Sequence, residues 1–299
     1  MTKKLFETIR QELPELSIRW GEPMQNHCSF RIGGPADVFV LPKSEGELLG
    51  ILALLRREGV KPFILGNGTN LLVRDEGIRG IVIKLAAGFD GIERDGNRIY
   101  AGCGATLART AVFAQTNGLG GMEFAHGIPG SVGGAVYMNA GAYGGEMKDI
   151  VKSVLYINSD GEICESTEND FSYRHSRFSD TDNVILGATL ELYEADSEEI
   201  GAKMRELMEK RSSSQPLDKP SAGSTFKRPV GGYAAAMIDQ SGLKGYSVGG
   251  AQVSEKHAGF VINAGGATFC DVMALIEHIQ KTVFEKFDTQ LETEVKIIG

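Results

Sequence analysis

A glycine-rich turn at residues 66–70 (Gly-Asn-Gly-Thr-Asn) directly follows residues 62–65, which predict a short buried strand. Glycines allow a backbone to approach a ligand closely, and successive N–H groups in such a turn can bind a pyrophosphate. The turn lacks the dinucleotide fingerprint, because Leu71 stands where the third glycine belongs, and the chain holds no GxxxxGK[ST] phosphate loop. A phosphate site and an ordinary tight turn both remain open.

A second glycine-rich segment covers residues 127–135 (GIPGSVGGA) and 139–144 (NAGAYG). Ten glycines fall in the 28 positions from Gly118 to Gly145, with apolar residues between them and no three-residue period, which excludes collagen and a flexible linker. The segment predicts either a backbone wall against a large flat ligand, with amide groups as donors, or close packing between two elements.

Two further segments gather cations. In residues 171–178 (FSYRHSRF), Arg174, His175 and Arg177 lie between aromatic residues, which favours partial burial and recognition of a carboxylate or phosphate over a solvated loop. In residues 221–229 (SAGSTFKRP), a serine hydroxyl stands beside Lys227 and Arg228 on a glycine-permitted turn; a basic, serine-rich loop is the alternative.

The last segment, residues 291–298 (LETEVKII), alternates as a strand with Leu291, Thr293, Val295 and Ile297 on one face. Spacing alone makes Glu294 a solvent-facing, structural carboxylate.

The composition describes an ordinary globular protein: 299 residues, 42% hydrophobic, 39 glycines and a net charge of −8. The negative charge opposes nonspecific binding to nucleic acid or an anionic membrane. The four cysteines have no metal-ligand or disulfide spacing, so we expect reduced thiols and no metal site. We expect a cytoplasmic protein, since the N-terminus is charged and no run of about 18 apolar residues occurs.

The spacing of apolar residues, together with turn and capping residues, predicts helices and strands along the whole chain. Strands joined as hairpins favour an α+β fold over a doubly wound one, with the main domain boundary near residue 195. The predicted helices cover residues 45–58, 106–117, 196–210, 233–240 and 269–287, and the predicted strands cover 62–65, 81–85, 91–94, 98–101, 151–158, 162–165, 184–192, parts of 248–263, and 291–298.

Taken in order from Asn26 to Ile298, these segments resemble one family, the bacterial UDP-N-acetylenolpyruvoylglucosamine reductases of peptidoglycan synthesis. The match rests on the ordered set of motifs: residues 29–36 (SFRIGGPA), 66–72 (GNGTNLL), 127–135, 139–144, 173–178 (YRHSRF), 221–229, 249–263 (GGAQVSEKHAGFVIN) and the LETEVKIIG ending.

The resemblance implies a vanillyl-alcohol-oxidase/PCMH-type FAD-binding region of two α+β lobes over residues 1–195, split near 85–90. A smaller α+β substrate-binding domain would cover residues 196–299. It also implies noncovalent FAD, NADPH as the hydride donor and UDP-N-acetylglucosamine enolpyruvate as the substrate, which is reduced to UDP-N-acetylmuramate. We expect a monomer that binds neither nucleic acid nor membrane.

The same resemblance assigns roles to residues. Arg174 and Glu294 would stabilise the enolate formed during reduction, and Ser224 would protonate it. The FAD-binding residues would be Gly66, Asn67, Gly68, Thr69, Asn70, Leu71, Gly127, Ile128, Pro129, Gly130, Ser131, Gly133, Gly134, Ala135 and Asn139, and the substrate-binding residues would be Tyr143, Arg177, Lys227 and Gln252.

Two alternatives remain open from the sequence. One is a related FAD-dependent sugar or alcohol oxidase, and the other is a flavin- or nucleotide-sugar-binding protein without turnover. If the glycines form a flavin wall, Gly130→Val or Gly133→Val should lose FAD before losing the fold.

Overall fold

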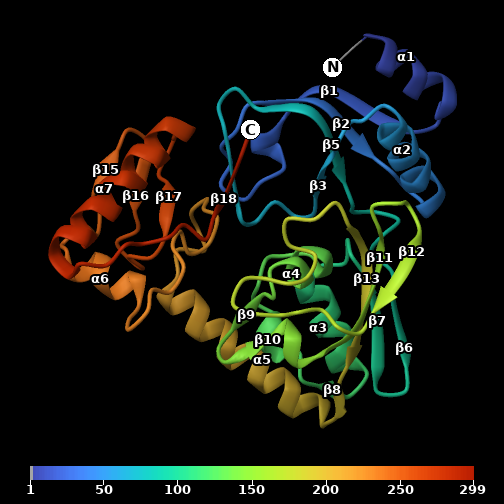
Figure 1. The fold of residues 1–299 in the computed structure, drawn as a ribbon. Coiled ribbons are helices and arrows are strands. Elements are labelled where there is room, and N and C mark those ends of the chain that lie inside the picture. The colour runs from blue at the N-terminus through green and yellow to red at the C-terminus, as the bar shows by residue number, and fades with distance from the viewer. Residues whose placement is uncertain (1–2) are drawn as a thin grey trace. The chain divides into compact units, whose positions relative to one another are not determined.

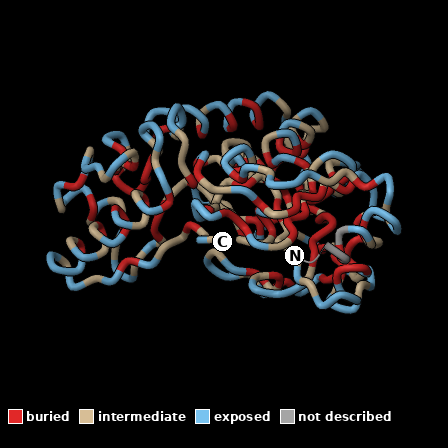
Figure 2. Tube along the Cα trace, turned by 90° about the horizontal axis from the view of Figure 1, so that it is seen from above, coloured by how far each residue is buried: buried red, intermediate tan, exposed pale blue. Residues whose placement is uncertain are grey.

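The computed structural model describes residues 3–299, which form two compact units. The first unit comprises the chain up to Arg19, Val38–Asn67 and Gly80–Lys210, and the second comprises Trp20–Asp37, Gly68–Arg79 and Arg211–Gly299. Each unit buries its own hydrophobic core (Figure 2).

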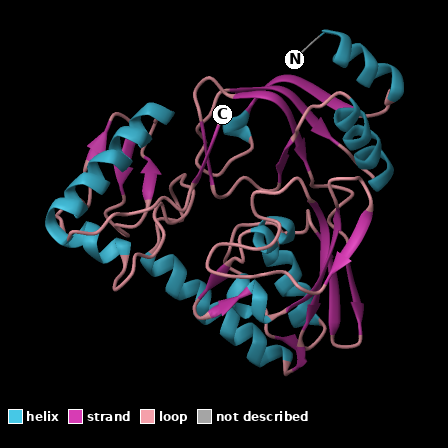
Figure 3. Ribbon diagram, viewed as in Figure 1, coloured by secondary structure: helices cyan, strands magenta, loops and turns pink. Residues whose placement is uncertain are grey.

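The chain contains both helices and strands, and several strands often follow one another without a helix between them (Figure 3). The helices are α1 (Lys3–Glu12), α2 (Glu45–Arg57), α3 (Leu107–Thr116), α4 (Val132–Tyr137), α5 (Ser197–Ser214), α6 (Ala234–Gln240) and α7 (Phe269–Phe287). The strands are β1 (Ser17–Pro23), β2 (Pro35–Leu41), β3 (Phe63–Leu65), β4 (Leu71–Val73), β5 (Ile78–Lys84), β6 (Ile92–Asp95), β7 (Arg98–Gly102), β8 (Leu119–Gly120), β9 (Gly141–Ala142), β10 (Gly145–Glu146), β11 (Val151–Ile157), β12 (Ile163–Ser166), β13 (Val184–Glu191), β14 (Tyr193–Glu194), β15 (Ser247–Val248), β16 (Ala251–Val253), β17 (Val261–Asn263) and β18 (Lys296–Ile298).

A five-stranded antiparallel sheet in the order β12-β11-β13-β7-β6 organises the first unit. The two predicted hairpins are confirmed, and β13 pairs with both of them at the centre of the sheet. Central β13 is buried at most positions, and helix α4 packs on β13 and β7 (Figure 1). A four-stranded sheet has the order β1-β2-β5-β3, in which β3 and β5 run parallel.

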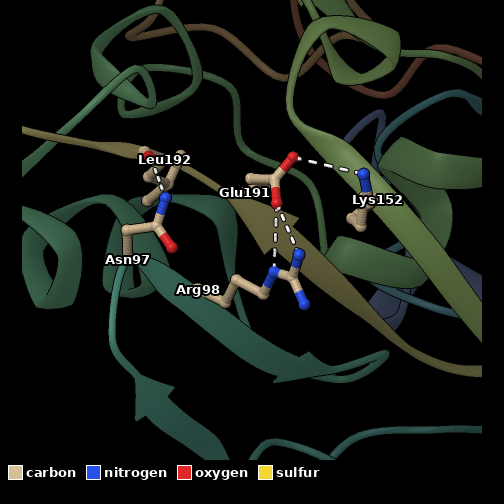
Figure 4. A network of polar contacts seen from close by, with 5 residues as sticks. All are labelled: Asn97, Arg98, Lys152, Glu191 and Leu192. Carbon is tan, nitrogen blue, oxygen red and sulfur yellow. Dashed lines mark hydrogen bonds and ion pairs between the residues drawn. The ribbon is translucent and has the colours of Figure 1, made fainter.

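An exposed polar network crosses the five-stranded sheet (Figure 4). Glu191 on β13 accepts two hydrogen bonds from Arg98 on β7, at 2.7 and 3.0 Å, and pairs with Lys152 on β11 at 3.4 Å. The Arg98 hydrogen bonds, followed by that of Lys152, hold the pKa of Glu191 below its ordinary value. Nearby, the Asn97 amide donates to the Leu192 carbonyl at 3.0 Å, so polar contacts reinforce the strand register.

The second unit contains the sheet β15-β16-β17, with α7 packed on β15 and β16 and α6 packed on α7 (Figure 1). The predicted helix at residues 269–287 is confirmed as α7, and apolar residues at helical spacing form its buried face: Val272, Ile276 and Ile279 are fully or almost fully buried. Thr268 and Asp271 form a reciprocal capping box at the start of this helix.

Two expectations need correction. The predicted strand at residues 291–298 is shorter: β18 begins at Lys296 and runs parallel to β4, and Ile297 is 36% exposed, so the alternation fails there. Helix α5 continues through Ser214, four residues beyond the predicted end at 210. The functional boundary near residue 195 stays a prediction; by packing, the first unit continues to Lys210, because α5 buries Ile200 and Met204 in the first core.

Across residues 3–299, the helices do not reach the length and apolarity that a membrane span requires.

Candidate active site

The first unit brings the two glycine-rich segments together. A Cβ atom on Gly66, directly after β3, would lie only 2.5 Å from the hydroxyl of Ser131, which caps helix α4. A side chain at position 66 would therefore displace the Ser131 hydroxyl from its capping position, whereas glycine allows the close approach. Residues separated by more than sixty positions thus meet in the unit, as a shared cofactor site requires.

Residues 130–133 run beside the connection between β7 and α3. The N–H of Leu107 donates to the Gly130 carbonyl at 3.0 Å, and the N–H of Val132 donates to the Ala105 carbonyl at 2.8 Å. The expectation that the amides of this segment face a ligand is therefore wrong at Val132, whose N–H is bonded within the protein.

Gly133 is a packing glycine. Its N–H donates to the Cys103 carbonyl at 2.9 Å, and a Cβ on Gly133 would lie 2.8 Å from the Cys103 Cβ, closer than real Cβ contacts allow. Burial raises the pKa of Cys103 to about 12, so this thiol packs as a neutral apolar group. The alternative of close packing between two elements is correct here, and Gly133→Val would disturb the fold first.

The remainder of the segment can accommodate a flat ligand. Gly134 is exposed, with 3.5 Å between its would-be Cβ and the Ser131 hydroxyl, and Pro129 is also exposed. Beside Gly127, the buried Nδ1 atom of His126 has no hydrogen-bond partner among the described residues. A buried polar atom without a partner is costly unless a ligand or water satisfies it, so these residues fit a planar group with hydrogen-bonding atoms.

The second half of the turn at residues 66–71 belongs to the second unit. Gly68 has a φ of 63°, and its Cβ position is occupied by the His27 carbonyl, so only glycine fits. Asn70 is bound to the C-terminal segment: its amide donates to the Glu294 carbonyl at 3.1 Å, and its own carbonyl accepts from Lys296 at 3.0 Å. Asn70 therefore holds the backbone that carries Glu294.

The second unit also brings Ser224 and Glu294 onto paired backbones. The N–H of Glu294 donates to the Thr225 carbonyl at 2.8 Å, and Phe226 pairs with Thr293 in an isolated antiparallel bridge. Thr225 is 2% exposed; its N–H donates to the Gly259 carbonyl at 2.9 Å and its hydroxyl accepts from Val261 at 3.0 Å. The residue next to Ser224 is thus fixed on two sides, and Ser224 and Glu294 themselves are half-buried.

Two predicted substrate-binding residues of the second unit already have protein partners. The Lys227 ammonium pairs with Glu292 at 3.1 Å, with the two side chains 42% and 72% exposed, so water screens this pair. The Gln252 amide nitrogen on β16 donates to Ser247 at 3.2 Å and to the Gly245 carbonyl at 3.3 Å.

Tyr143 lies at the tip of a hairpin that the sequence did not reveal. Strands β9 and β10 pair through Ala142 and Gly145, and the two connecting residues, Tyr143 and Gly144, have φ values of 54° and 91°. Left-handed values at both central positions are typical of the tight turn that joins antiparallel strands. The Tyr143 side chain is 45% exposed.

Arg174 occupies a similar position in a second tight turn. Ser172 and His175 exchange backbone hydrogen bonds at 3.0 and 3.2 Å around Tyr173 and Arg174, and Arg174 has a φ of 56°. Glycine usually takes such a position, because a side chain there costs about 1–2 kcal/mol. An arginine kept in this conformation marks a candidate functional residue.

Arg177 contacts strands β11 and β12 and the loop that follows β12. Its guanidinium donates to the Ser166 hydroxyl at 2.7 Å and to the Glu168 carbonyl at 2.9 Å, and it lies over the Tyr156 ring at 6.0 Å. These contacts show a structural role for Arg177; its role in substrate binding remains a prediction.

Asn139, predicted to bind FAD, is fully buried. Its amide donates to Glu146 at 2.8 Å and to the Ser172 carbonyl at 2.9 Å, and its side-chain oxygen accepts from Lys148 at 2.9 Å. These bonds use the amide on both sides, and the backbone N–H of Asn139 donates to the Val136 carbonyl at 3.2 Å. The backbone carbonyl of Asn139 is therefore what it could offer a cofactor. Sequence reasoning missed Glu146 and Thr225. The partners of Thr225 are distant in the sequence, whereas Glu146 bonds to nearby Asn139 and Lys148, whose spacing matches no known motif.

The three predicted catalytic residues are divided between the units: Arg174 belongs to the first, and Ser224 and Glu294 belong to the second. Their meeting in one active site remains a prediction.

Comparisons with known proteins agree over the whole chain. Residues 36–167 match the FAD binding domain model, and residues 215–298 match the model of the UDP-N-acetylenolpyruvoylglucosamine reductase C-terminal domain. The UDP-N-acetylenolpyruvoylglucosamine reductase of Caldanaerobacter subterraneus subsp. tengcongensis is 50% identical over 100% of this chain and 99% of its own length. The chain belongs to the UDP-N-acetylenolpyruvoylglucosamine reductase family.

Other members of this reductase family are similarly close. That of Clostridioides difficile is 48% identical over 99% of this chain and 98% of its own. The crystal structure of the Thermus caldophilus reductase, MurB, superposes with a TM-score of 0.82 at 34% identity, covering 95% of this chain and 99% of that one. The expected α+β fold with an FAD-binding region is confirmed.

For this reductase, Gly133 and Gly134 allow a matched test of packing against ligand binding. Gly133→Ala should lower the free energy of unfolding by about 1–3 kcal/mol, because its Cβ overlaps Cys103. Gly134→Ala should leave stability unchanged or raise it by about 0.5–1 kcal/mol, because helix α4 has room there. Urea unfolding of the flavin-free protein measures both, and equal stabilities would contradict the packing role of Gly133.

The free energy of unfolding of Arg174→Gly should exceed that of Arg174→Ala by about 1 kcal/mol, because glycine adopts a φ of 56° without strain. Urea unfolding measures this difference as a higher midpoint for the glycine variant. Arg177 is the control, since it is absent from the described residues with positive φ. There, glycine should be the less stable of the two substitutions. If alanine were more stable than glycine at both positions, Arg174 would not be strained.

Proposed function

We propose that this protein reduces the enolpyruvyl group of UDP-N-acetylglucosamine enolpyruvate to UDP-N-acetylmuramate, a step of peptidoglycan precursor synthesis. Bound FAD supplies a two-electron carrier that passes hydride from NADPH to the substrate. The observation that carries the proposal is 50% identity to a reductase of this name over the full length of the chain. The paired backbones beside Ser224 and Glu294 support it.

The reaction determines which groups the protein must supply. Hydride addition at the β-carbon of an enolpyruvyl ether leaves negative charge on the α-carbon, delocalised into the carboxylate. A cation or acid must stabilise this enolate, and a donor must protonate its carbon. The net reaction consumes one NADPH and one proton for each enolpyruvyl group reduced.

We assign these tasks to three residues. Arg174 provides the cation, and its exposed turn can present the guanidinium to a carboxylate in bidentate geometry. Glu294 assists the enolate through a shared proton, and Ser224 donates a proton to the α-carbon. The backbone bonds of Thr225 fix the position of Ser224, which a proton donor requires.

We also propose the cofactor and substrate contacts. Residues 66–71, 127–131, 133–135 and Asn139 hold noncovalent FAD, with Gly134 and the Nδ1 atom of His126 offering space and an unsatisfied polar group. Tyr143, Arg177, Lys227 and Gln252 bind the substrate, which requires Lys227 to exchange its exposed partner Glu292 for a substrate group. Residues 1–195 form the FAD-binding region, with lobes divided near 85–90, and residues 196–299 form the substrate domain of a cytoplasmic monomer.

The visible spectrum of the purified protein tests the function. Under anaerobic conditions NADPH should bleach the flavin absorbance, and UDP-N-acetylglucosamine enolpyruvate should restore it. Rapid reoxidation by oxygen with a sugar or alcohol as the electron source would instead identify an oxidase. A bound flavin that neither NADPH nor the substrate affects would identify a binding protein.

Ser224→Ala should slow reoxidation of the reduced flavin by the substrate by about 10²–10⁴-fold, because it removes the proton donor. Flavin reduction by NADPH should keep its rate, since that half-reaction does not use this proton. Stopped-flow absorbance separates the two steps. Ser241→Ala is the control: the Ser241 hydroxyl bonds to Met237 within α6, and its loss should alter neither step. A normal reoxidation rate in Ser224→Ala would refute the assigned role.

A further inference from the structure

The first unit contains a buried polar link between the two tight turns that carry Tyr143 and Arg174. Asn139 follows helix α4, is 0% exposed, and has a φ of 44°. One amide bond reaches Glu146, on the strand that follows the Tyr143 turn, and the other reaches the Ser172 carbonyl, which closes the Arg174 turn. We call these two hydrogen bonds the Asn139 link.

The Asn139 side chain is itself held in one orientation. Its oxygen accepts from the Lys148 N–H at 2.9 Å, so the amide nitrogen must face Glu146 and Ser172. Glu146 is a suitable acceptor because it is ionised: the Lys148 hydrogen bond first, then the bond from Asn139 and the positive charge of Arg174, hold the pKa of Glu146 below its ordinary value. A charged acceptor strengthens the Asn139 bond.

The turn around Arg174 needs such support. Ser172 and His175 close it with backbone hydrogen bonds, yet Arg174 adopts a left-handed conformation that disfavours a side chain. Strained residues persist when their surroundings fix them. The Asn139 bond to the Ser172 carbonyl supplies this constraint from the buried side of the turn.

We propose that Asn139 is a positioning residue for the reductase reaction, which holds the Arg174 turn against the Tyr143 turn through its bonds to Ser172 and Glu146. This inference rests on the proposed function for its effect on turnover, and on the described hydrogen bonds for its effect on the turns. Asn139 acts through Arg174: without the link, the guanidinium is present but is not held in its productive place.

Asn139→Asp tests the link with little change in size. Aspartate tolerates a left-handed φ, but it replaces both N–H donors with oxygen that repels the Glu146 carboxylate and the Ser172 carbonyl. In the FAD-loaded protein, amide exchange of residues 170–178 and 141–146 should speed up by about tenfold or more. Turnover should fall by about 10²-fold, while flavin reduction by NADPH keeps its rate.

Three further variants make the test specific. In an Arg174→Ala background, Asn139→Asp should cause little additional loss of turnover, because the residue through which it acts is gone. In Asn139→Asp with Glu146→Gln, the new amide can donate to the aspartate, so exchange should recover at 141–146 but not at 170–178. If Asn139→Asp fails to fold, Asn139→Gly removes the link without a buried charge at a φ that suits glycine.

Asn97→Asp is the matched control. Asn97 also donates its amide to a backbone carbonyl in the first unit, that of Leu192 (Figure 4), and it lies outside both turns. This variant should leave exchange at 170–178 and turnover unchanged.

Unchanged exchange at 170–178 in Asn139→Asp and Asn139→Gly would overturn the proposal. So would losses of turnover that multiply with those of Arg174→Ala. A wild-type protein that does not reduce the substrate would refute the proposed function instead, and the exchange measurements would still decide whether the link exists.

Discussion

The first unit depends on one close approach of backbone to backbone, where Gly133 meets Cys103. The contact leaves no room for a Cβ, and the neighbouring N–H groups of Val132 and Gly133 bond across it. It fixes helix α4 on the end of β7 and so sets the position of Ser131, against which Gly66 lies. A predicted cofactor-binding surface thus depends on a packing contact. At least one glycine of the glycine-rich segment, Gly133, therefore serves packing rather than ligand binding.

In the second unit, the backbone beside Ser224 and Glu294 is positioned by hydrogen bonds outside the regular sheet. Residues 291–295 lie outside any strand, yet their backbone pairs with residues 225–227 and with Asn70. Thr225 is the centre of this arrangement, because its N–H, carbonyl and hydroxyl are all bonded. Fixing the residue beside Ser224 at three points restricts the serine, while Ser224 itself is only half-buried, as a residue that must meet a substrate requires.

Much of the fold could be predicted from local signals. Caps at Ser44, Thr106 and Thr268 start helices where the sequence predicts them, and the Asp-Gly turns join the hairpins of the five-stranded sheet. Helix α4 was missed because two of its six residues are glycines, which disfavour helix in isolation. Its capping serine and its packing on β13 and β7 override that preference.

The candidate site was less predictable, for a physical reason. Motifs identify Arg174, Ser224 and Glu294 as residues with suitable chemistry, but the bonds that position such residues join distant parts of the chain. Asn139 reaches Ser172 across 33 residues, and Asn70 reaches Glu294 across 224. Both asparagines lie in motifs that suggest cofactor binding, and their side chains also donate to backbone carbonyls, which no spacing rule reveals.

Some non-glycine residues with a positive φ are explained by turn structure, and others are not. Asp170, Asp180 and Asp288 also have positive φ, but aspartate tolerates this conformation and caps turns. Arg31, Tyr143 and Arg174 are not residues that favour this conformation, and glycine occupies most of the other positive-φ positions among the described residues. Of these three, Tyr143 and Arg174 lie on the two turns that the Asn139 link joins. If turn geometry alone mattered, glycine would stabilise both sites by about 1 kcal/mol. The chain keeps bulky side chains at both positions despite this cost in stability, and a buried amide joins the two turns. This indicates that the interactions of the two side chains matter more than the strain free energy of their backbone conformation.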